Sequence, residues 1–210
     1  MRRRDFLTAT GAAAAAGLAG CSSTTELPTE LSGTESNPDQ LPRPTRGDGA
    51  VTVDVFKDHG CPACHQYYLT IFPEIRENYI DTGDITYNFY DYPLPADERT
   101  VVLNNAARAV QDDTRTSDDP NGAFWEYVEL LYTNTDSWTD SNLGQFAEDV
   151  GADPDFVQGA IDTEQYYPQL VADWNEANRR EAEGTPSVYV EGQQVDTSLA
   201  DITQAIDQHL

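Results

Sequence analysis

Residues 51–64 read VTVDVFKDHGCPAC, a strand pattern that leads directly into a pair of cysteines. Val51–Phe56 is rich in β-branched residues and roughly alternating, which predicts a strand that enters the core. Lys57–Gly60 is expected to form a short turn. From Cys61 onward, apolar residues recur at helical spacing until Gly83 supplies a stop. The two cysteines are therefore predicted to lie at the start of a helix that follows a strand.

A Cys-x-x-Cys pair in that position suits thiol exchange. Unpaired N–H groups and the helix dipole stabilise an anion at the helix start, so a pKa between about 3.5 and 7.5 is expected for the Cys61 thiol. Pro62 fits the first turn, because a proline there gives up no hydrogen bond. Cys64 lies less than one turn further on, near enough to form a disulfide. Cys61 is then expected to be the attacking sulfur and Cys64 the buried resolving sulfur, with exchange through a mixed disulfide.

Other uses of the cysteine pair are less favoured. A metal knuckle needs further ligands, and His59, His65 and His209 do not make a convincing four-coordinate zinc site. A copper-delivery module is also disfavoured, because Met1 is the only methionine. A purely structural disulfide would close too small a loop to constrain the unfolded chain. We therefore expect no metal and no cofactor.

The rest of the chain predicts a helical block between strands. Ile85–Tyr92 is predicted to be a second strand, and residues 96–183 contain five successive helical patterns and no convincing strand. Strand character returns at Ser187–Val190, and Ser198 opens a final helix with a capping box. Strands interrupted by helices imply a βαβ crossover and a partly parallel sheet.

Aromatic residues of the helical block are predicted to belong mainly to the core, with a groove for unfolded substrate as the alternative. They are Phe124, Trp125, Tyr127, Trp138 and Trp174.

Gly184-Thr185-Pro186 directly precedes the Ser187–Val190 strand and completes a recognisable pattern. From about residue 50 to 210 the chain resembles the DsbA-like branch of the thioredoxin superfamily. The residues that carry the resemblance are Phe56, Asp58, Cys61-Pro62-Ala63-Cys64, Tyr90-Asp91-Tyr92-Pro93-Leu94 and Gly184-Thr185-Pro186.

The resemblance implies a thioredoxin-like α/β fold, with an all-helical subdomain at about 96–183 inserted between the second and third core strands. It also implies that the Thr185–Pro186 bond is cis and packs beside the cysteines. The Thr185 backbone is then expected to pair with an extended substrate segment. An ordinary trans proline that starts a strand is the alternative.

Two positions depart from the family pattern. Many relatives carry a buried acid six positions before the first cysteine, where it moves the proton of the resolving thiol, and that position is Val55 here. Proton transfer from Cys64 must then use water or a neighbour such as His59 or His65. For each histidine, however, a surface position with no catalytic function is the favoured interpretation. The strongest oxidases carry a histidine after the proline. Ala63 offers the thiolate no hydrogen-bond donor, so a weaker oxidant is expected.

The N-terminal residues are typical of an export signal. Residues 1–20 combine Arg2–Arg4 with a weakly apolar run too short to span a bilayer, a pattern similar to a twin-arginine signal. Residues 18–21 resemble a lipobox, so we expect cleavage before Cys21 and a lipid on its sulfur. An ordinary secretory signal with an incidental cysteine is the alternative. Residues 21–49, rich in small and polar residues, are predicted to form a flexible tether to a domain at 50–210.

The chain is strongly acidic, with 37 Asp and Glu against 12 Lys and Arg and a net charge of −25. Self-repulsion of this size is screened at molar salt, where the Debye length falls to about 3 Å, so we expect a halophilic origin. An acidic surface for a basic partner is the less favoured alternative, because the acids are scattered along the chain. Nucleic-acid binding is strongly disfavoured.

Together these expectations describe a thiol:disulfide oxidoreductase that acts on cysteine-containing exported proteins outside the cytoplasm, held at the outer membrane face by lipid on Cys21. Disulfides persist outside the cytoplasm, which favours the oxidase direction. An oxidase needs reoxidation by a membrane partner of the quinone-linked kind that the family uses. The alternative is a reductase or isomerase kept reduced by a membrane electron carrier, and the sequence does not choose between them.

Overall fold

The structure is a computed structural model that describes residues 26–210; the predicted signal and Cys21 lie outside the described residues. Its centre is a five-stranded mixed sheet with the strand order β1-β3-β2-β4-β5. The strands are β1 (Thr45–Arg46), β2 (Val51–Lys57), β3 (Ile85–Asp91), β4 (Ser187–Val190) and β5 (Gln193–Val195). β2 and β3 are parallel, and β4 pairs antiparallel with β2 on its other side. The predicted crossover and partly parallel sheet are thus confirmed.

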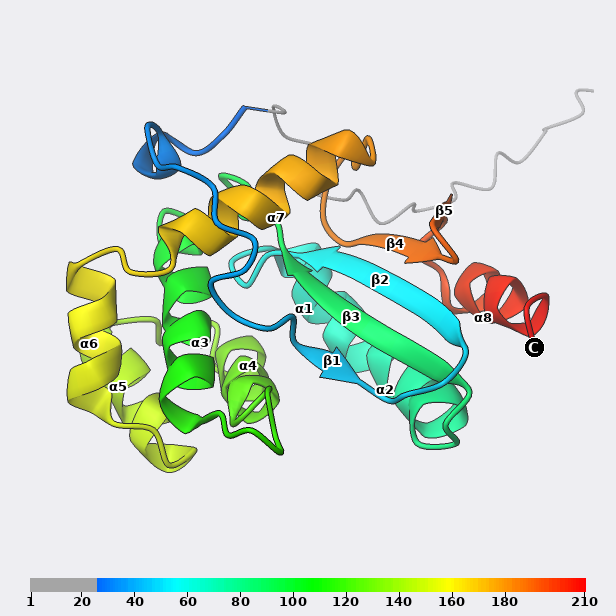
Figure 1. Cartoon of the computed structure of the whole chain (residues 1–210), viewed down its shortest axis with the longest axis horizontal. Coiled ribbons are helices and arrows are strands. Elements are labelled where there is room, and N and C mark those ends of the chain that lie inside the picture. Colours follow the sequence, from blue (N-terminus) through cyan, green and yellow to red (C-terminus); the bar gives the residue numbers. More distant parts are fainter. Residues whose placement is uncertain (1–25) are drawn as a thin grey trace, which may run out of the picture.

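A block of helices lies between β3 and β4 in the sequence and beside the sheet in space (Figure 1). The block consists of α3 (Thr100–Thr114), α4 (Phe124–Thr133), α5 (Asp140–Asp149), α6 (Pro154–Asp162) and α7 (Tyr167–Arg179). Outside it, the described residues form η1 (Thr29–Leu31), α1 (Pro62–Thr70), α2 (Phe72–Ile75), a π-helical turn η2 (Arg76–Ile80) and α8 (Leu199–Asp207). The five helices α3–α7 confirm the predicted helical insertion between the second and third core strands. No helix within residues 26–210 is long and apolar enough to cross a membrane.

Successive side chains of β2 face two different layers, because strand residues alternate in direction. Val53 and Val55 are fully buried in the layer that holds α1, α2 and α4. Phe56 faces the opposite layer, where its ring stacks on Tyr90 with 4.5 Å between centroids and packs with residues of α7. A strand covered on both faces explains why β2 is almost continuously buried.

Local signals in the sequence set several helix ends. Gly151 follows α5 with a φ of 85°, a conformation that glycine adopts without steric cost. The Asp153 side chain accepts a hydrogen bond from the Asp155 N–H, and Pro154 occupies the first turn of α6. Ser198 accepts from the Asp201 N–H at the start of α8, as the capping-box pattern predicts.

Residues 26–49 pack against the domain, which corrects the prediction of a flexible tether for this part of the chain. Leu31 is fully buried in a cluster with residues of α3 and α7, and Leu41 is 5% exposed in the main core. Thr45–Arg46 pairs with β3 as an edge strand. The segment has few apolar residues, but its leucines and backbone hydrogen bonds are enough to hold it in place.

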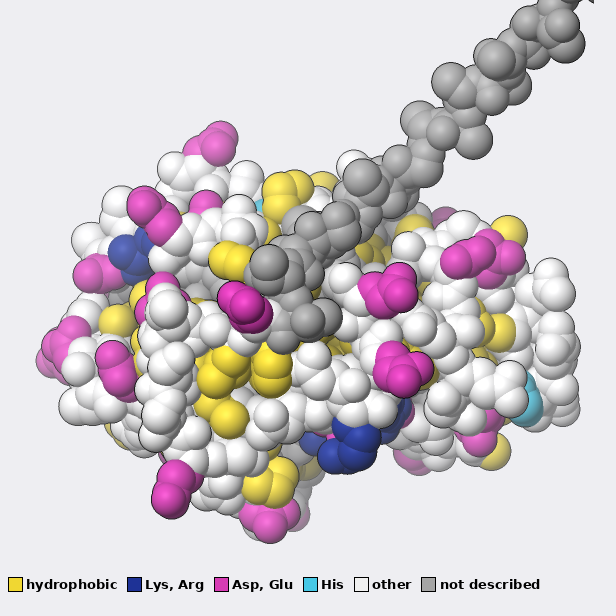
Figure 2. Space-filling model, turned by 90° about the horizontal axis from the view of Figure 1, so that it is seen from above, with side chains coloured by type: hydrophobic (Ala, Val, Ile, Leu, Met, Phe, Trp, Pro, Cys, Tyr) yellow, Lys and Arg dark blue, Asp and Glu magenta, His cyan; other side chains and the backbone are white. Residues whose placement is uncertain are grey.

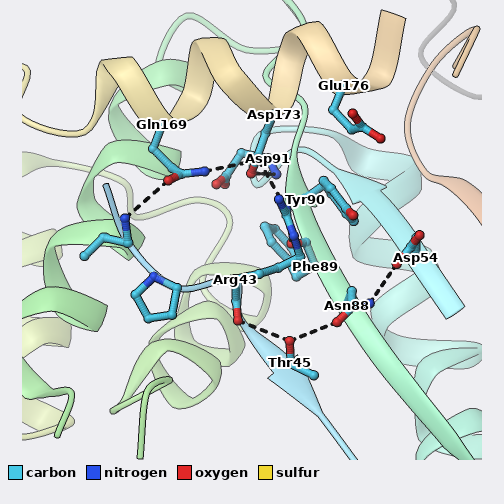
Figure 3. A network of polar contacts seen from close by, with 12 residues as sticks. Arg43, Thr45, Asp54, Asn88, Phe89, Tyr90, Asp91, Gln169, Asp173 and Glu176 are labelled. Atoms are coloured by element: carbon cyan, nitrogen blue, oxygen red, sulfur yellow. Dashed lines mark hydrogen bonds and ion pairs between the residues drawn. The ribbon is translucent and has the colours of Figure 1, made fainter. Parts of the chain in front are cut away.

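A buried network of charges joins this N-terminal segment, β3, α3 and α7. Figure 3 shows Arg43, Asp91 and Asp173 of this network. Arg108 donates from Nε to Asp91 at 2.5 Å and from Nη2 to Asp173 at 3.0 Å, and all three side chains are at most 1% exposed. Arg43 donates to the other carboxylate oxygen of Asp173 at 3.2 Å. Burial raises the pKa of Asp91 to about 6, whereas the charge of Arg108 acts to lower it. The network couples elements that are far apart in the sequence.

Acidic side chains are dispersed over the face of the molecule drawn in Figure 2, and basic side chains on that face are few. The charge imbalance of the sequence is therefore spread over this face rather than concentrated in one acidic patch.

Candidate active site

The two cysteines lie at the entrance of α1, as the sequence predicts. Cys61 is the N-cap residue and Pro62 occupies the first turn. The Cys61 N–H donates to the Asp58 carbonyl at 3.2 Å, and the Cys61 carbonyl accepts from the His65 N–H at 3.2 Å. Cys64 follows within the first helical turn. Both sulfurs are present as thiols, and both residues are buried.

The Thr185–Pro186 peptide bond is cis, as the family resemblance implies. The Cys61 thiol donates to the Thr185 carbonyl with 3.4 Å between sulfur and oxygen, so the loop and the cysteine are in contact across 124 residues of sequence. The loop is positioned by the antiparallel pairing of β4 with β2, in which Ser187 lies opposite Phe56. Ser187 Oγ also donates to the Gly184 carbonyl at 2.7 Å and closes the loop on itself.

Cys64 has the surroundings of a sulfur that holds its proton. Burial raises the pKa of its thiol well above the ordinary value, and the hydrogen bond and charge of Cys61 raise it further. The Asp58 N–H donates to the Cys64 sulfur at 3.5 Å, which acts in the opposite direction. Cys64 therefore suits the resolving role, because a protonated buried sulfur does not compete with Cys61 for substrate.

The Asp58 carboxylate stabilises the turn that precedes Cys61. Its carboxylate accepts hydrogen bonds from four residues of three segments: Gly60 N–H at 2.9 Å, Leu94 N–H at 3.2 Å, Thr100 Oγ1 at 3.2 Å and Asn104 Nδ2 at 3.2 Å. Burial raises the pKa of Asp58 to about 7, against the hydrogen bonds from Gly60 and Leu94 that lower it. In the sequence, Asp58 is recognisable only as part of the family resemblance, because most of its partners come from the β3–α3 connection and from α3.

Lys57 lies near the cysteines as the last residue of β2, and not in the turn that the sequence predicts. It is the only lysine in the chain and is fully buried. Burial lowers its pKa to about 8. The alternation of β2 could have indicated that the Lys57 side chain is buried, because Lys57 lies on the same face of the strand as Val53 and Val55.

Neither nearby histidine is a solvent-exposed side chain. His59 is fully buried, so the prediction of a surface position is wrong for this residue. Its Nδ1 lies 3.2 Å from the Tyr132 hydroxyl, and burial lowers its pKa well below the ordinary value. His65 is partly buried and donates from Nε2 to the His59 carbonyl at 2.7 Å. Burial also lowers the pKa of His65.

The aromatic residues of the insertion are core residues. Phe124, Trp125 and Tyr127 are at most 4% exposed, while Trp138 and Trp174 are partly buried and pack against core clusters. This confirms the core interpretation over a substrate groove. Among residues 26–210, no group of three or more His, Cys, Asp and Glu side chains is arranged to hold a metal ion.

Comparisons with known proteins agree with this geometry. A family model described as thioredoxin matches residues 46–208. The probable disulfide bond formation protein D of Bacillus cereus is 26% identical over 172 residues, which cover 79% of this chain and 76% of that protein.

Two solved structures share the fold. Oxidised BdbD from Bacillus subtilis has a TM-score of 0.70 and 24% identity, with 79% of this chain and 91% of that chain covered. DsbA from Chlamydia trachomatis has a TM-score of 0.70 and 20% identity, with 83% and 93% covered. The chain belongs to the thioredoxin family, in which it is similar to the DsbA-like disulfide bond formation proteins.

Proposed function

We propose that this chain is a DsbA-like thiol:disulfide oxidoreductase that oxidises cysteine pairs in exported proteins through the Cys61–Cys64 couple. The observation that carries the proposal is the position of Cys61, which caps α1 and lies 3.4 Å from the carbonyl that precedes the cis proline. The helix start favours a thiolate at Cys61, and a second thiol lies in the same turn.

The reaction follows from the unequal surroundings of the two sulfurs. In the oxidised enzyme, a substrate thiolate attacks the Cys61 sulfur, the Cys61–Cys64 bond breaks and Cys64 leaves with the electron pair. A second substrate thiolate then attacks the substrate sulfur of the mixed disulfide and releases Cys61. The substrate leaves with one disulfide and the enzyme with two thiols. Because Cys61 is buried in this conformation, a substrate must displace part of its cover as it binds along Gly184–Pro186.

The oxidase direction and the location of the protein belong to the same proposal. Disulfides persist outside the cytoplasm, and residues 1–20, directly before Cys21, have the pattern of an export signal. We place the mature chain at the outer face of the membrane with lipid on Cys21, in a high-salt environment, with reoxidation by a quinone-linked membrane protein. Replacement of Cys21 with serine should release the protein from membranes, and continued membrane association would contradict the lipid anchor.

Trapping of mixed disulfides tests the exchange activity. Cys64→Ala is expected to accumulate covalent complexes with exported proteins, because the sulfur that resolves them is absent. These complexes should disappear on reduction and should be absent from the matched Cys61→Ala variant. Non-reducing gels and mass spectrometry of the captured cysteines provide the measurement. Equal trapping by the two variants, or none by Cys64→Ala, would overturn the assignment.

The reduction potential of the Cys61/Cys64 couple at high salt tests the direction. Isomerase-like and strongly oxidising couples lie at about −180 and −120 mV, whereas reducing thioredoxins lie near about −270 mV. The oxidase proposal predicts a value between the first two, because Ala63 gives the thiolate no hydrogen bond. A potential near that of thioredoxin would establish the reductase direction instead.

A further inference from the structure

The proton of Cys64 needs an acceptor, and the one carboxyl group that acts on this thiol, Asp58, already accepts hydrogen bonds from Gly60, Leu94, Thr100 and Asn104. Cys64 is buried with its proton, and the family's buried acid is replaced by Val55, a fully buried aliphatic side chain. His65 is engaged with a backbone carbonyl, and burial lowers the pKa of His59 well below the ordinary value. Exchange nevertheless requires Cys64 to lose and regain a proton in every cycle.

Lys57 lies on the face of β2 that points toward Cys64. It follows Val55 by two residues on the same face of the strand, about 6.6 Å further toward the cysteines at the usual rise of a strand. The Cys64 sulfur is 3.5 Å from the N–H of Asp58, which is the peptide nitrogen that joins Lys57 to Asp58. The Cys64 sulfur is therefore in contact with the backbone from which the Lys57 side chain extends.

The Lys57 side chain runs along the same face of α1 that carries Cys64. Cys64, Tyr67 and Tyr68 are spaced i, i+3 and i+4 and share one helical face. Lys57 Nζ lies 5.7 and 5.6 Å from the ring centroids of the two tyrosines. The rings of Phe72, Phe89 and Tyr132 lie 5.6, 5.3 and 5.1 Å from the same nitrogen.

No carboxylate balances the positive charge of Lys57 among the five rings that surround its Nζ. Its Nζ is buried and has no hydrogen-bond partner among the described residues, and the rings around it offer only their π faces. The titratable and charged groups that act on Lys57 or surround it are Cys64, His65, Tyr67 and Tyr68 of α1, Tyr132 of α4, His59 and Arg46. None of them is a carboxylate. The cation is stabilised by aromatic faces and by Cys64 when that sulfur is ionised.

We propose that Lys57 is the acid–base partner of Cys64, taking the role of the missing carboxyl group by holding the proton that Cys64 gives up and takes back. This inference rests on the proposed thiol exchange. Burial lowers the pKa of Lys57 to about 8, so both of its protonation states are populated near neutral pH. In relatives with the buried acid, a carboxyl group at the position of Val55, two residues earlier on the same face of the strand, would exchange this proton with Cys64.

Lys57 can hold the proton of Cys64 both when the enzyme is reoxidised and when it oxidises a substrate. When reduced enzyme is reoxidised, the Cys61 thiolate forms a mixed disulfide with the incoming disulfide and displaces one thiolate. Neutral Lys57 then takes the proton of Cys64 through one bridging water or after its side chain turns toward the sulfur, because Nζ makes no hydrogen bond in this conformation. The Cys64 thiolate attacks the Cys61 sulfur and displaces the second thiolate, and Lys57 returns its proton to solvent. When substrate is oxidised, the ammonium of Lys57 protonates Cys64 as the Cys61–Cys64 bond breaks.

The attack of Cys64 on a mixed disulfide at Cys61 can be measured separately with glutathione. Reduced full-length protein in a Cys21→Ser background is mixed with excess oxidised glutathione at molar KCl, quenched with acid and analysed by mass spectrometry. Formation of the Cys61–glutathione adduct reports attack by Cys61, and its decay reports attack by Cys64. Both rates are followed from pH 6 to pH 10.

The expected result separates the two steps. In the parent protein, adduct decay accelerates with pH and levels off above about 8 as Lys57 becomes neutral. In Lys57→Met, decay at pH 7.5 should be roughly 100-fold slower and should keep rising with pH without levelling. Adduct formation should change little. Lys57→Gln provides a second neutral variant, and Arg76→Met, which removes a half-exposed cation from η2, should match the parent.

Two failures have different meanings. If the parent forms no adduct at Cys61, the proposed function fails. If the adduct forms and both neutral Lys57 variants resolve it with the parent's rate and pH profile, thiol exchange stands and the role of Lys57 is refuted. Equal slowing of both steps would identify a structural effect of the substitution and would also refute the acid–base role.

Discussion

Replacement of Arg108 with methionine is expected to destabilise the fold by about 4 kcal/mol near pH 7.5, because removal of one partner from a buried ion pair costs about 3–5 kcal/mol. The guanidinium contacts Asp91 at 2.5 Å and Asp173 at 3.0 Å, and no contacting side chain is more than 1% exposed. Arg43 remains beside Asp173, but its side chain is 28% exposed and does not contact Asp91.

The loss should depend on pH in a defined direction. Burial already raises the pKa of Asp91 to about 6, and Arg108 is the largest influence that lowers it. Without Arg108 that pKa rises further, so the folded variant holds a proton at pH 7.5 that the folded parent has lost. Over each pH unit in which the folded variant carries this extra proton, its free energy of unfolding falls by about 1.4 kcal/mol relative to that of the parent. The destabilisation should therefore be about 2 kcal/mol smaller at pH 5 than at pH 7.5.

Urea unfolding at molar KCl, followed by tryptophan fluorescence at both pH values, measures these free energies. Arg115→Met is the matched control, because the Arg115 side chain is 43% exposed and its guanidinium lies 2.7 Å from the Asp112 carboxylate. That variant should lose less than about 1 kcal/mol. A loss below about 1 kcal/mol for Arg108→Met, or an equal loss at pH 5 and pH 7.5, would refute the reasoning.

Three further predictions follow from single side chains. Lys57→Met should stabilise the fold at pH 7 by up to about 3 kcal/mol, because burial lowers the pKa of Lys57 from 10.5 to about 8 and penalises the charged folded form. The gain should shrink as pH rises from 8 to 10.5; urea titrations check this, and a gain independent of pH would contradict it. Ala63→His should make the Cys61 couple about 30–60 mV more oxidising, if one hydrogen bond to the thiolate contributes about 1.5–3 kcal/mol. Equilibration with glutathione measures this, and an unchanged potential would contradict it. Leu31→Ala should cost about 2–4 kcal/mol in urea unfolding, because the side chain is fully buried. The exposed control Glu35→Ala should cost less than about 0.5 kcal/mol, and equal costs would show that residues 26–49 contribute no packing.

The order of strands and helices could be predicted because it depends on local periodicity. The alternation of residues 51–56 and the helical spacing after Cys61 fix the direction of side chains within a few residues of chain. Caps at Asp153 and Ser198 and the glycine after α5 are also local, since each satisfies backbone groups one to three residues away. These predictions needed no knowledge of what packs against each element.

The candidate site was predictable where it depends on motifs. The cysteine pair at the helix start follows from spacing, and the cis bond before Pro186 follows from the family resemblance. Lys57 was missed because a lysine one residue beyond a predicted strand is ordinarily exposed, and only the five rings from α1, α2, α4 and β3 enclose it. His59 was missed for the same reason.

The sequence alone determined the elements from β2 onward, the helical insertion and the position of the cysteine pair, because these depend on interactions between residues near one another in the chain. Only the tertiary structure decided which polar groups are buried and what they face. The contact of Arg108 with Asp173 spans 65 residues, and the packing of Leu31 depends on α3 and α7. Such contacts require several segments to be folded at once, so no local pattern in any one of them records the result.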